Sequence, residues 1–364
     1  MDHRRRGTDM GRAPLRVGLL GYGIAGRVFH APLVAATPGL RLDAVVTRDP
    51  ERRAQVHAEH PDARVLDDAD QLWQAADTLD LVVVATPNRQ HVPMARAAIA
   101  AGLPVVVDKP LAPTAAEGRA LVAEAAAAGV PLTSFQNRRW DGDFLTVRRL
   151  VEAGELGRVA RFESRFERWR PAIKPGWRES AAPGEAGGAL FDLGAHLVDQ
   201  AVQLFGPVQR VYAEVDRRRP GAEVDDDAFV ALTHAGGVRS HLWMSAVTAQ
   251  LGPRFRVLGD RAAYTTHGLD PQEAALRDGG RPGTHGWGEV DAERYGRLGA
   301  DGELRAVPTE AGRYQDFYAQ LAAALRDGAP LPVDPADSVD VVELIELAHQ
   351  AATQGVTLPV PPMS

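Results

Sequence analysis

The sequence predicts an α/β fold in two parts, a doubly wound parallel sheet followed by an α+β part with a mainly antiparallel sheet. In residues 14–136, short apolar runs alternate with helical patterns, which is typical of buried parallel strands joined by helices. After residue 136 the runs become longer and alternate between apolar and polar, which indicates antiparallel strands. A chain of 364 residues has room for about two domains, so we place one at 14–136 and one at 137–364.

The composition narrows the class of protein. Hydrophobic residues make up 45% of the chain and charged residues 24%, which are ordinary values for a globular protein. A formal net charge of −7 argues against nucleic acid as a partner, because proteins bind nucleic acid by neutralising its phosphates. The chain has no cysteine, which excludes disulfides, thiolate metal ligands and a cysteine nucleophile, and permits a reducing compartment.

The N-terminal residues 1–13 are polar and contain three consecutive arginines, Arg4, Arg5 and Arg6. A twin-arginine export signal needs an apolar segment after the arginines, and residues 7–12 provide no such segment. No apolar stretch approaches the roughly 20 residues that a membrane-spanning helix needs. We therefore expect a disordered tail on a cytoplasmic protein that has no membrane partner.

A glycine turn after the first strand is the main local signal. The apolar run 15–20 suits a buried strand, and Gly21, Gly23 and Gly26 follow it in a G-x-G-x-x-G spacing before a helical pattern. In such a turn the first glycine permits the bend, the second lets backbone amides approach a pyrophosphate, and the third lets the helix pack closely on the strand. Glycines are also common in ordinary turns, but the strand before and the helix after favour dinucleotide binding at the helix N-terminus.

The remaining elements of the first part follow in order. Further strands are predicted at 40–47, 64–66, 81–85, 104–107 and 132–135. Helices are predicted from Pro50, over 91–101 and over 114–129, where Thr114 and Glu117 form a capping box. A sheet of this kind binds ligands at the carboxyl ends of its strands, so the residues after these strands are the candidates for a site.

The second part has a different pattern of predicted helices and strands. Helices are predicted over 144–153, 316–326 and 336–352. Strands are predicted at 159–166, 208–215, 229–234, 238–247 and 255–258, with a hairpin turn at 236–237. Residues 277–302 are rich in glycine and charge, so we expect a long loop there.

Lys109, Asp192 and His196 stand out among the polar residues. Lys109 ends the fifth strand and precedes Pro110, a residue that can take the cis form; the alternative is a solvated lysine in a turn. Asp192 and His196 are four residues apart among apolar neighbours, so a helix would place them on one face. Burying these two polar side chains costs desolvation free energy unless they form a pair or take part in function. Both a structural Asp–His pair in the core and a catalytic pair agree with this pattern. A metal site does not, because no third ligand of similar character lies nearby in the sequence.

Two polar clusters lie at and beyond the junction of the two parts. Residues 136–141 suit contacts to a substrate or cofactor at a domain junction, or alternatively a salt-bridged linker. The second cluster could offer donors to a hydroxyl-rich ligand, or form a packed surface loop. It comprises Arg168, Arg170, Trp177 and Arg178.

The end of the second strand bears on the choice of cofactor. In an NAD-preferring sheet of this kind, an acidic residue roughly 20 positions beyond the glycines binds the ribose 2′-hydroxyl. Here the strand ends in Thr47 and Arg48, and Arg48 can form charge-assisted bonds to a 2′-phosphate with help from the Thr47 hydroxyl. Asp49 is the alternative ribose ligand, but it leads into the helix that starts at Pro50. We therefore predict NADP as the cofactor, with NAD as the alternative.

Several motifs together resemble the glucose-fructose oxidoreductase and inositol dehydrogenase family (Gfo/Idh/MocA) over residues 15–356. They are the glycine turn with Phe29-His30-Ala31-Pro32, the turn Ala85-Thr86-Pro87-Asn88 with His91, Asp108-Lys109-Pro110, and Asp192 to His196. The stretches 137–141, 170–171, 177–179, 191–196 and 287–288 are further similar to NADP-dependent scyllo-inositol dehydrogenases. One departure is Asp108, where the family usually has glutamate; the charge is kept, so we take the change as minor.

The resemblance implies an N-terminal Rossmann domain and a C-terminal α+β domain whose large open sheet joins subunits into a homodimer or homotetramer. It also implies that Lys109 and His196 handle the proton of the reacting hydroxyl, and that Asp192 binds the substrate and orients its partner. An unperturbed histidine has a pKa near ~6.5 and an unperturbed lysine near ~10.4, so His196 is the expected general base near neutrality.

The predicted function is a dehydrogenase that passes a hydride between NADP(H) and a cyclic polyol, with scyllo-inositol and its inosose as the favoured pair and no metal. Expected cofactor contacts are Gly21, Tyr22, Gly23, Ile24, Ala25, Gly26, Thr47, Arg48, Thr86, Pro87, Asn88, His91, Asp108 and Gln136. Expected substrate contacts are Asn137, Trp140, Arg168, Arg170, Trp177 and Arg178. The alternatives are another sugar or sugar derivative as the substrate, and a non-catalytic dinucleotide sensor, which would be expected to lack Lys109, Asp192 or His196.

Overall fold

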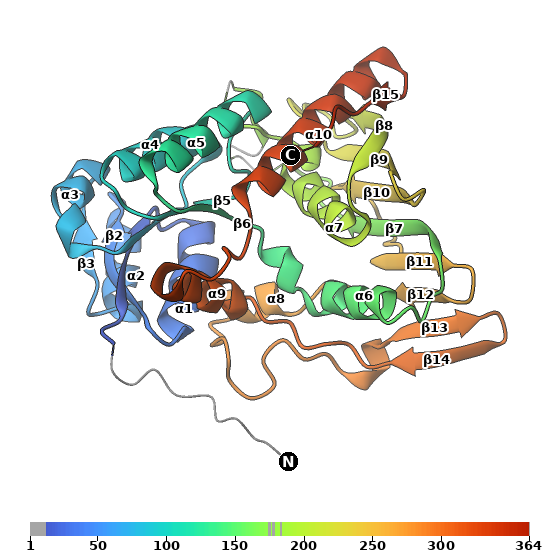
Figure 1. The fold of residues 1–364 in the computed structure, drawn as a ribbon, viewed down its shortest axis with the longest axis horizontal. Helices are drawn as coiled ribbons and strands as arrows, with labels where there is room; N and C mark the ends of the chain where they lie inside the picture. The colour runs from blue at the N-terminus through green and yellow to red at the C-terminus, as the bar shows by residue number, and fades with distance from the viewer. Residues whose placement is uncertain (1–11, 174–175, 177–178, 183, 364) are drawn as a thin grey trace.

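The computed structural model describes residues 12–173, 176, 179–182 and 184–363. Within them two sheets form the body of the molecule, with helices on their faces (Figure 1). The predicted disordered tail falls outside the described residues from residue 1 to 11, and so do Trp177 and Arg178.

The first sheet has six parallel strands in the order β3-β2-β1-β4-β5-β6. Their bounds are Leu15–Leu20 (β1), Leu40–Val46 (β2), Arg64–Leu66 (β3), Leu81–Val84 (β4), Val105–Asp108 (β5) and Leu132–Phe135 (β6). Every residue of β4 is buried, because helices cover both faces of a doubly wound sheet. The strand order reverses between β1 and β4, which places a crevice at their carboxyl ends. The predicted doubly wound sheet is thus confirmed.

The helices of the first part are α1 (Ala31–Ala36), α2 (Pro50–Glu59), α3 (Ala69–Gln74), α4 (His91–Ala100) and α5 (Ala115–Ala128). The Thr114 side chain accepts a hydrogen bond from the backbone amide of Glu117, as the capping box predicts. A helix follows the glycine turn, as predicted, and it begins with a π-helical segment, Ala25–His30. Pro32 in the next turn has no N–H and its ring crowds the carbonyl four residues earlier, which favours the wider π turn.

The second sheet has nine strands in the order β14-β13-β12-β11-β7-β10-β9-β8-β15. Their bounds are Val159–Glu167 (β7), Val208–Asp216 (β8), Asp227–His234 (β9), Arg239–Ser245 (β10), Phe255–Gly259 (β11), Ala263–Thr266 (β12), Gly296–Ala300 (β13), Glu303–Val307 (β14) and Leu358–Pro359 (β15). The β7–β10 pair is parallel and the other paired neighbours are antiparallel, so the sheet is mainly antiparallel, as predicted.

The expectation of a single long loop over 277–302 is wrong. Its last residues form β13, which pairs with β12 and β14 and extends the sheet. Strand β13 contains two glycines, Gly296 and Gly299, and a Cβ on either would overlap neighbouring atoms. The glycines that suggested a loop are therefore close-packing residues of a strand.

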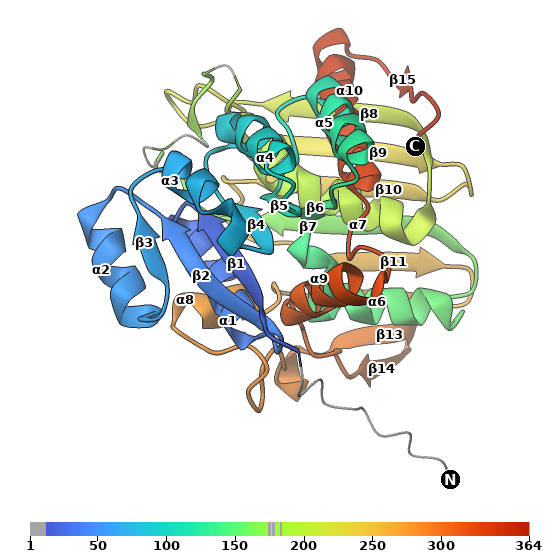
Figure 2. The ribbon, with the colours of Figure 1, turned by 60° about the vertical axis from the view of Figure 1, so that its left-hand side comes forward.

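The helices of the second part are α6 (Gly142–Glu152), α7 (Ala195–Phe205), α8 (Gln272–Arg277), α9 (Gln315–Asp327) and α10 (Pro335–Gln354). A π-helical segment, Leu190–Gly194, leads directly into α7. Helices α6, α7 and α10 lie on the face of the second sheet that is turned toward the first (Figures 1 and 2).

Helices α9 and α10 connect the two sheets. Helix α9 packs on α1, and Tyr314, Phe317 and Tyr318 are fully buried in the same core cluster as Phe135 of β6. The Tyr318 hydroxyl lies 2.6 Å from Nδ1 of the buried His30. Helix α10 contacts both α5 and β8, and the two views place it between them (Figures 1 and 2). The last helices of the chain thus fix the first sheet against the second.

The opposite face of the second sheet carries aromatic and charged side chains at half-buried positions. Phe229 and Trp243 lie 5.0 Å apart between ring centroids, and the Arg165 guanidinium lies 4.0 Å above the Trp243 ring. Trp169, just after β7, is 58% exposed. Among the described residues, no helix has the length and apolar character needed to cross a membrane.

Candidate active site

Two cavities lie at the carboxyl ends of the first sheet. The larger one, of ≈ 950 Å³, lies beside the glycine turn and is called here the glycine-turn cavity. The smaller one, of ≈ 180 Å³, lies between the two sheets and is called the junction cavity. Ile24, Ala25, Asp108 and Lys109 line both cavities, so the two adjoin at the end of β5. A ligand in one cavity can therefore reach a ligand in the other.

The three glycines of the turn have distinct surroundings. Gly21 has a φ of +95°, and a Cβ there would come within 2.6 Å of the Ala85 carbonyl oxygen. A Cβ on Gly26 would overlap the Gly21 carbonyl oxygen. A Cβ on Gly23 would meet only the Arg52 side chain, at 4.0 Å, so it would project into the glycine-turn cavity. This is the open backbone cradle that a pyrophosphate requires, and the residues present therefore fit a dinucleotide.

The turn after β4 forms the opposite wall of the glycine-turn cavity. Thr86, Pro87 and Asn88, which were expected to contact the cofactor, line the cavity, and Nδ2 of Asn88 donates to the backbone carbonyl of Glu185 at 2.7 Å. His91 was expected to contact the cofactor, but it lines neither cavity. Its Nδ1 and Nε2 lie 2.8 and 3.0 Å from the carbonyl oxygens of Pro110 and Thr86. His91 therefore holds the two loops behind the cavity wall.

Thr47 and Arg48 line the far end of the glycine-turn cavity, and Arg52 of α2 lies beside them. The side chain of Arg48 donates one hydrogen bond, from Nε to the Asp67 carbonyl at 3.1 Å, and its terminal nitrogens have no partner among the described residues. Arg52 was not anticipated; it lies one helical turn beyond Arg48 and pairs only loosely with Asp49, at 3.8 Å. Two guanidinium groups with spare donors thus face this end of the cavity.

Three carboxylates at the same end, those of Asp49, Asp67 and Asp68, make other contacts. Asp49 caps α2 and accepts from the backbone amides of Glu51 and Arg52. This geometry argues against Asp49 as a ribose ligand. Asp67 pairs with Arg53 at 2.5 Å, and Asp68 caps α3.

Lys109, Asp192 and His196 come together where the two cavities adjoin. The Lys109 ammonium donates to the Asp192 carboxylate at 2.9 Å and to the Asp192 carbonyl oxygen at 2.5 Å. The Lys109–Pro110 peptide is cis. Asp192 lies in the π-helical segment and His196 at the start of α7, and both line the junction cavity with Lys109. The sequence spacing predicted the Asp–His proximity, and the structure adds the ion pair to lysine.

The electrostatic surroundings keep His196 neutral. Burial, followed by the nearby cations Lys109 and Arg138, holds the pKa of His196 well below its ordinary value. Its Nδ1 has no hydrogen-bond partner among the described residues. A neutral imidazole that lines the cavity can accept a proton at neutral pH.

The remaining predicted substrate contacts divide into two groups. Asn137, Arg168 and Arg170 line the junction cavity. Trp140, and Gln136, which was expected at the cofactor, line neither cavity. Gln136 is only 2% exposed, and Trp140 packs edge-on against Phe317 of α9 because it belongs to the core between the two sheets.

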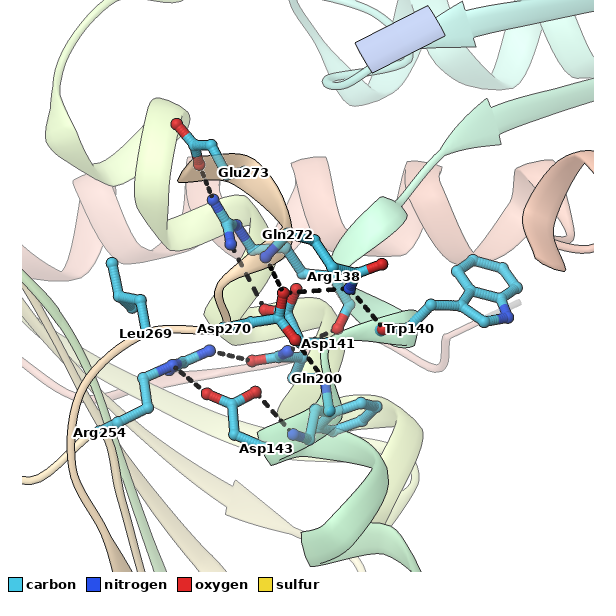
Figure 3. Close-up of polar contacts among 12 residues, drawn as sticks. Arg138, Trp140, Asp141, Asp143, Gln200, Arg254, Leu269, Asp270, Gln272 and Glu273 are labelled. Atoms are coloured by element: carbon cyan, nitrogen blue, oxygen red, sulfur yellow. Dashed lines mark hydrogen bonds and ion pairs between the residues drawn. The ribbon is translucent and has the colours of Figure 1, made fainter. Parts of the chain in front are cut away.

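Arg138 is a cavity residue that the sequence analysis included in the cluster 136–141 but did not name among the expected substrate contacts. It lines the junction cavity, is 5% exposed and lies 4.6 Å above the ring of Phe166. Figure 3 shows its guanidinium between two carboxylates, with Glu273 at 2.6 Å and Asp141 at 3.4 Å. Its position between Asn137 and Trp140 could have indicated a site residue. Glu273 lies on α8, far along the chain, and nothing near it in the sequence indicates a role in the cavity.

Further buried polar side chains form a hydrogen-bonded network around Arg138 (Figure 3). Gln200 donates to the Arg138 carbonyl and accepts from Arg254, which also pairs with Asp143 at 3.3 Å. Burial raises the pKa of Asp143 to about 6, and burial with two neighbouring aspartates raises that of Asp270 to about 8. Asp270 nevertheless accepts a hydrogen bond from the Gly142 backbone amide at 2.7 Å, so it fixes the start of α6.

Comparison with protein families assigns both parts of the chain. Residues 15–135 match the family described as oxidoreductase family, NAD-binding Rossmann fold. Residues 144–265 match the GFO/IDH/MocA C-terminal domain. Together the two matches cover most of the chain and support a nicotinamide dinucleotide as the cofactor.

Several relatives align along nearly the whole chain. The scyllo-inositol 2-dehydrogenase (NADP(+)) IolW of Bacillus subtilis is 34% identical over 94% of this chain and 95% of its own length. The oxidoreductase YdgJ of Escherichia coli is 40% identical over 94% of this chain and 98% of its own length. Among solved structures, the YPO2259 oxidoreductase of Yersinia pestis has a TM-score of 0.89 at 39% identity and covers 97% of this chain and 99% of its own.

The cradle at Gly23 leads to a prediction about dinucleotide binding. We expect Gly23→Ala to weaken NADPH binding at least tenfold, because the added methyl group would project into the space for the pyrophosphate. The melting temperature should not change, since Gly23 has no positive φ and its Cβ meets no backbone. Gly236→Ala is the matched control, because a Cβ on this hairpin residue meets nothing within 4 Å. Unchanged NADPH affinity in Gly23→Ala, measured by fluorescence titration, would contradict the cradle.

Proposed function

The chain belongs to the GFO/IDH/MocA oxidoreductase family, and on this basis we propose that it transfers a hydride between NADP(H) and a ring carbinol or ketone of a cyclic polyol. The observation that carries the proposal is the meeting of Lys109, Asp192 and His196 where the two cavities adjoin. A nicotinamide dinucleotide supplies the hydride chemistry when it is bound. The first substrate to test is scyllo-inositol with its inosose, because the relative IolW carries that activity in its name.

The proposal divides the proton chemistry among the three side chains. Lys109 is held in place by Asp192, and its ammonium can donate to the reacting hydroxyl oxygen and stabilise the charge that develops there. His196 is neutral and lines the junction cavity, so it can take the hydroxyl proton. Both lysine and histidine therefore contribute, one as a charged donor and one as a base.

The preference for NADP rests on the far end of the glycine-turn cavity. Arg48 and Arg52 have spare donors there, and guanidinium groups bind phosphate through paired charge-assisted hydrogen bonds. Thr47 adds a hydroxyl on the same wall. We propose that these residues bind the 2′-phosphate and that the enzyme works in the cytoplasm, where reduced dinucleotides are kept.

The catalytic assignment is tested by alanine variants of the proton-handling residues. Lys109→Ala and His196→Ala should each lower kcat at least ~10²-fold, the usual scale for a lost proton-transfer group. The dissociation constant for NADPH should change far less. The exposed His57 of α2 provides the control variant, His57→Ala, which should leave kcat unchanged.

The pH dependence separates this role from a merely structural one. Because the pKa of His196 is held below its ordinary value, His196 stays unprotonated as the pH falls through 6.5, and kcat/KM should stay flat there. A near-normal kcat in His196→Ala would exclude it as the base. A fall in kcat/KM near pH 6.5 that the variant abolishes would instead contradict the lowered pKa, because it would mean that His196 is an ordinary, solvated histidine.

The cofactor assignment is tested by comparing the two dinucleotides. A lost phosphate–guanidinium contact costs ~1.5–3 kcal/mol, so Arg48→Ala should weaken NADPH binding roughly 10- to 150-fold while NADH binding barely changes. Arg52→Ala should act in the same direction. Arg96→Ala, on the exposed face of α4, is the control. Equal losses for both cofactors, or a wild-type preference for NAD, would refute the role of Arg48.

We further propose that subunits associate through the outer face of the second sheet as a homodimer or homotetramer. Trp243 lies on this face beside Phe229, and strand alternation places the exposed Trp169 on the same side. Light scattering should give two or four times the chain mass of 39.1 kDa. Trp243→Glu should reduce the mass to that of one chain, and Val356→Glu, at an exposed site after α10, should not. A monomeric wild type would contradict the proposal.

A further inference from the structure

The walls of the junction cavity carry more positive than negative charge. Among the described residues that line it, five side chains are cationic and three are carboxylates. Two of the carboxylates are occupied by cations of the same cavity: Asp192 pairs with Lys109, and Glu273 pairs with both Arg138 and Arg277. The cations without such a pair are Arg168 and Arg170.

Arg168 and Arg170 have no ion pair and no side-chain hydrogen bond within the part of the chain that the structure describes. The Arg168 guanidinium lies 4.7 Å above the ring of Phe166, where contact with the ring removes water from one side of it. Burial, and then the repulsion of Arg170, lower the pKa of Arg168 to about 10. A half-buried cation beside a like charge is costly unless a ligand supplies the opposite charge.

The two arginines are positioned by backbone that continues the sheet beyond β7. The backbone amides of Arg168 and Arg170 donate to the carbonyl oxygens of Ser245 and Ala246, at 2.8 and 2.7 Å. The Thr248 amide donates to the Arg168 carbonyl oxygen at 3.0 Å. Alternation along an extended chain then directs residues 166, 168 and 170 to the same side, which is the junction cavity. The backbone of both arginines is therefore held in the cavity wall, with Arg168 half-buried and Arg170 exposed.

We propose that the preferred substrate is a cyclic polyol that carries an anionic substituent, either a ring carboxylate or a phosphate monoester, and that Arg168 and Arg170 bind this substituent. The reacting hydroxyl would lie at Lys109 and His196, which line the same cavity. A guanidinium fork binds carboxylate and phosphate oxygens in pairs, which gives orientation as well as affinity. The inference rests on the proposed dehydrogenase function and narrows its substrate, since a neutral cyclitol leaves both cations unpaired.

The test compares substrates that share a ring and differ in charge. With NADP, kcat/KM is measured for D-glucose, D-glucuronate and D-glucose 6-phosphate, and for myo-inositol and its 1-phosphate. In at least one set, kcat/KM for the charged member should be tenfold or more above that for its neutral counterpart. Raising the salt concentration from 0.1 to 0.5 M should reduce this charged-to-neutral ratio. The uronate and the phosphates separate the two sources of negative charge. Equal or better turnover of the neutral member in every set overturns the proposal.

Variants assign the effect to the arginines. Arg168→Gln and Arg170→Gln should each lower the charged-to-neutral ratio at least fivefold. Arg158→Gln, at the residue before β7 and with a side chain 88% exposed, is the matched control and should leave the ratio unchanged. Melting temperatures show whether each variant folds. A loss in Arg168→Gln that is equal for charged and neutral substrates would mean that the arginine has only a structural role, and would overturn the proposal.

A binding measurement keeps this inference distinct from the proposed function. If no ring polyol is oxidised, the dehydrogenase proposal for cyclic polyols fails. D-Glucuronate and D-glucose 6-phosphate are then titrated into the NADPH-bound protein, with nucleotide fluorescence as the signal. Binding that is lost in Arg168→Gln supports the anion site without the polyol activity, and absence of binding by both anions overturns the site.

Discussion

The ion pair between Lys109 and Asp192 is the contact on which the candidate site depends. Lys109 follows β5 of the first sheet, whereas Asp192 belongs to the π-helical segment of the second part, 83 residues later. That segment is itself tied to the second sheet, because the Leu190 amide donates to the Asp225 carboxylate at 2.7 Å. The pair therefore exists only when the two sheets are docked in one orientation, and the same docking creates the junction cavity.

The docking is maintained by apolar packing, and the buried charges near Arg138 add orientation to it. Phe317 and Tyr318 of α9, and Tyr314 just before it, are completely buried against the first sheet, which provides the favourable free energy of burial. The charged network in Figure 3 is costly to bury, and replacing such networks by apolar groups is often neutral or stabilising. Its evident contribution is geometric, because Asp141 and Glu273 hold the Arg138 guanidinium in the cavity wall.

Local signals in the sequence were sufficient for the first sheet and for the motifs that directly follow its strands. The apolar runs, the glycine turn and the capping box at Thr114 each depend on residues close in sequence, and each was predicted correctly. Contacts made across the fold had no local signal. Trp140 looked like a site residue because it lies in a polar stretch, but α9, some 175 residues later, buries it. The same limit applies to Glu273, whose importance appears only when α8 meets Arg138.

The electrostatics of the cavity connect substrate recognition with proton transfer. The cations Lys109 and Arg138 hold the pKa of His196 low, so the neutral base is ready but its protonated form is disfavoured. Charge that accumulates on His196 during oxidation would be more stable if a negative group were bound in the same cavity. An anionic substituent at Arg168 and Arg170 provides such a charge, and it would raise the pKa of His196 toward its ordinary value. On this argument the group that identifies the substrate also improves the base that acts on it.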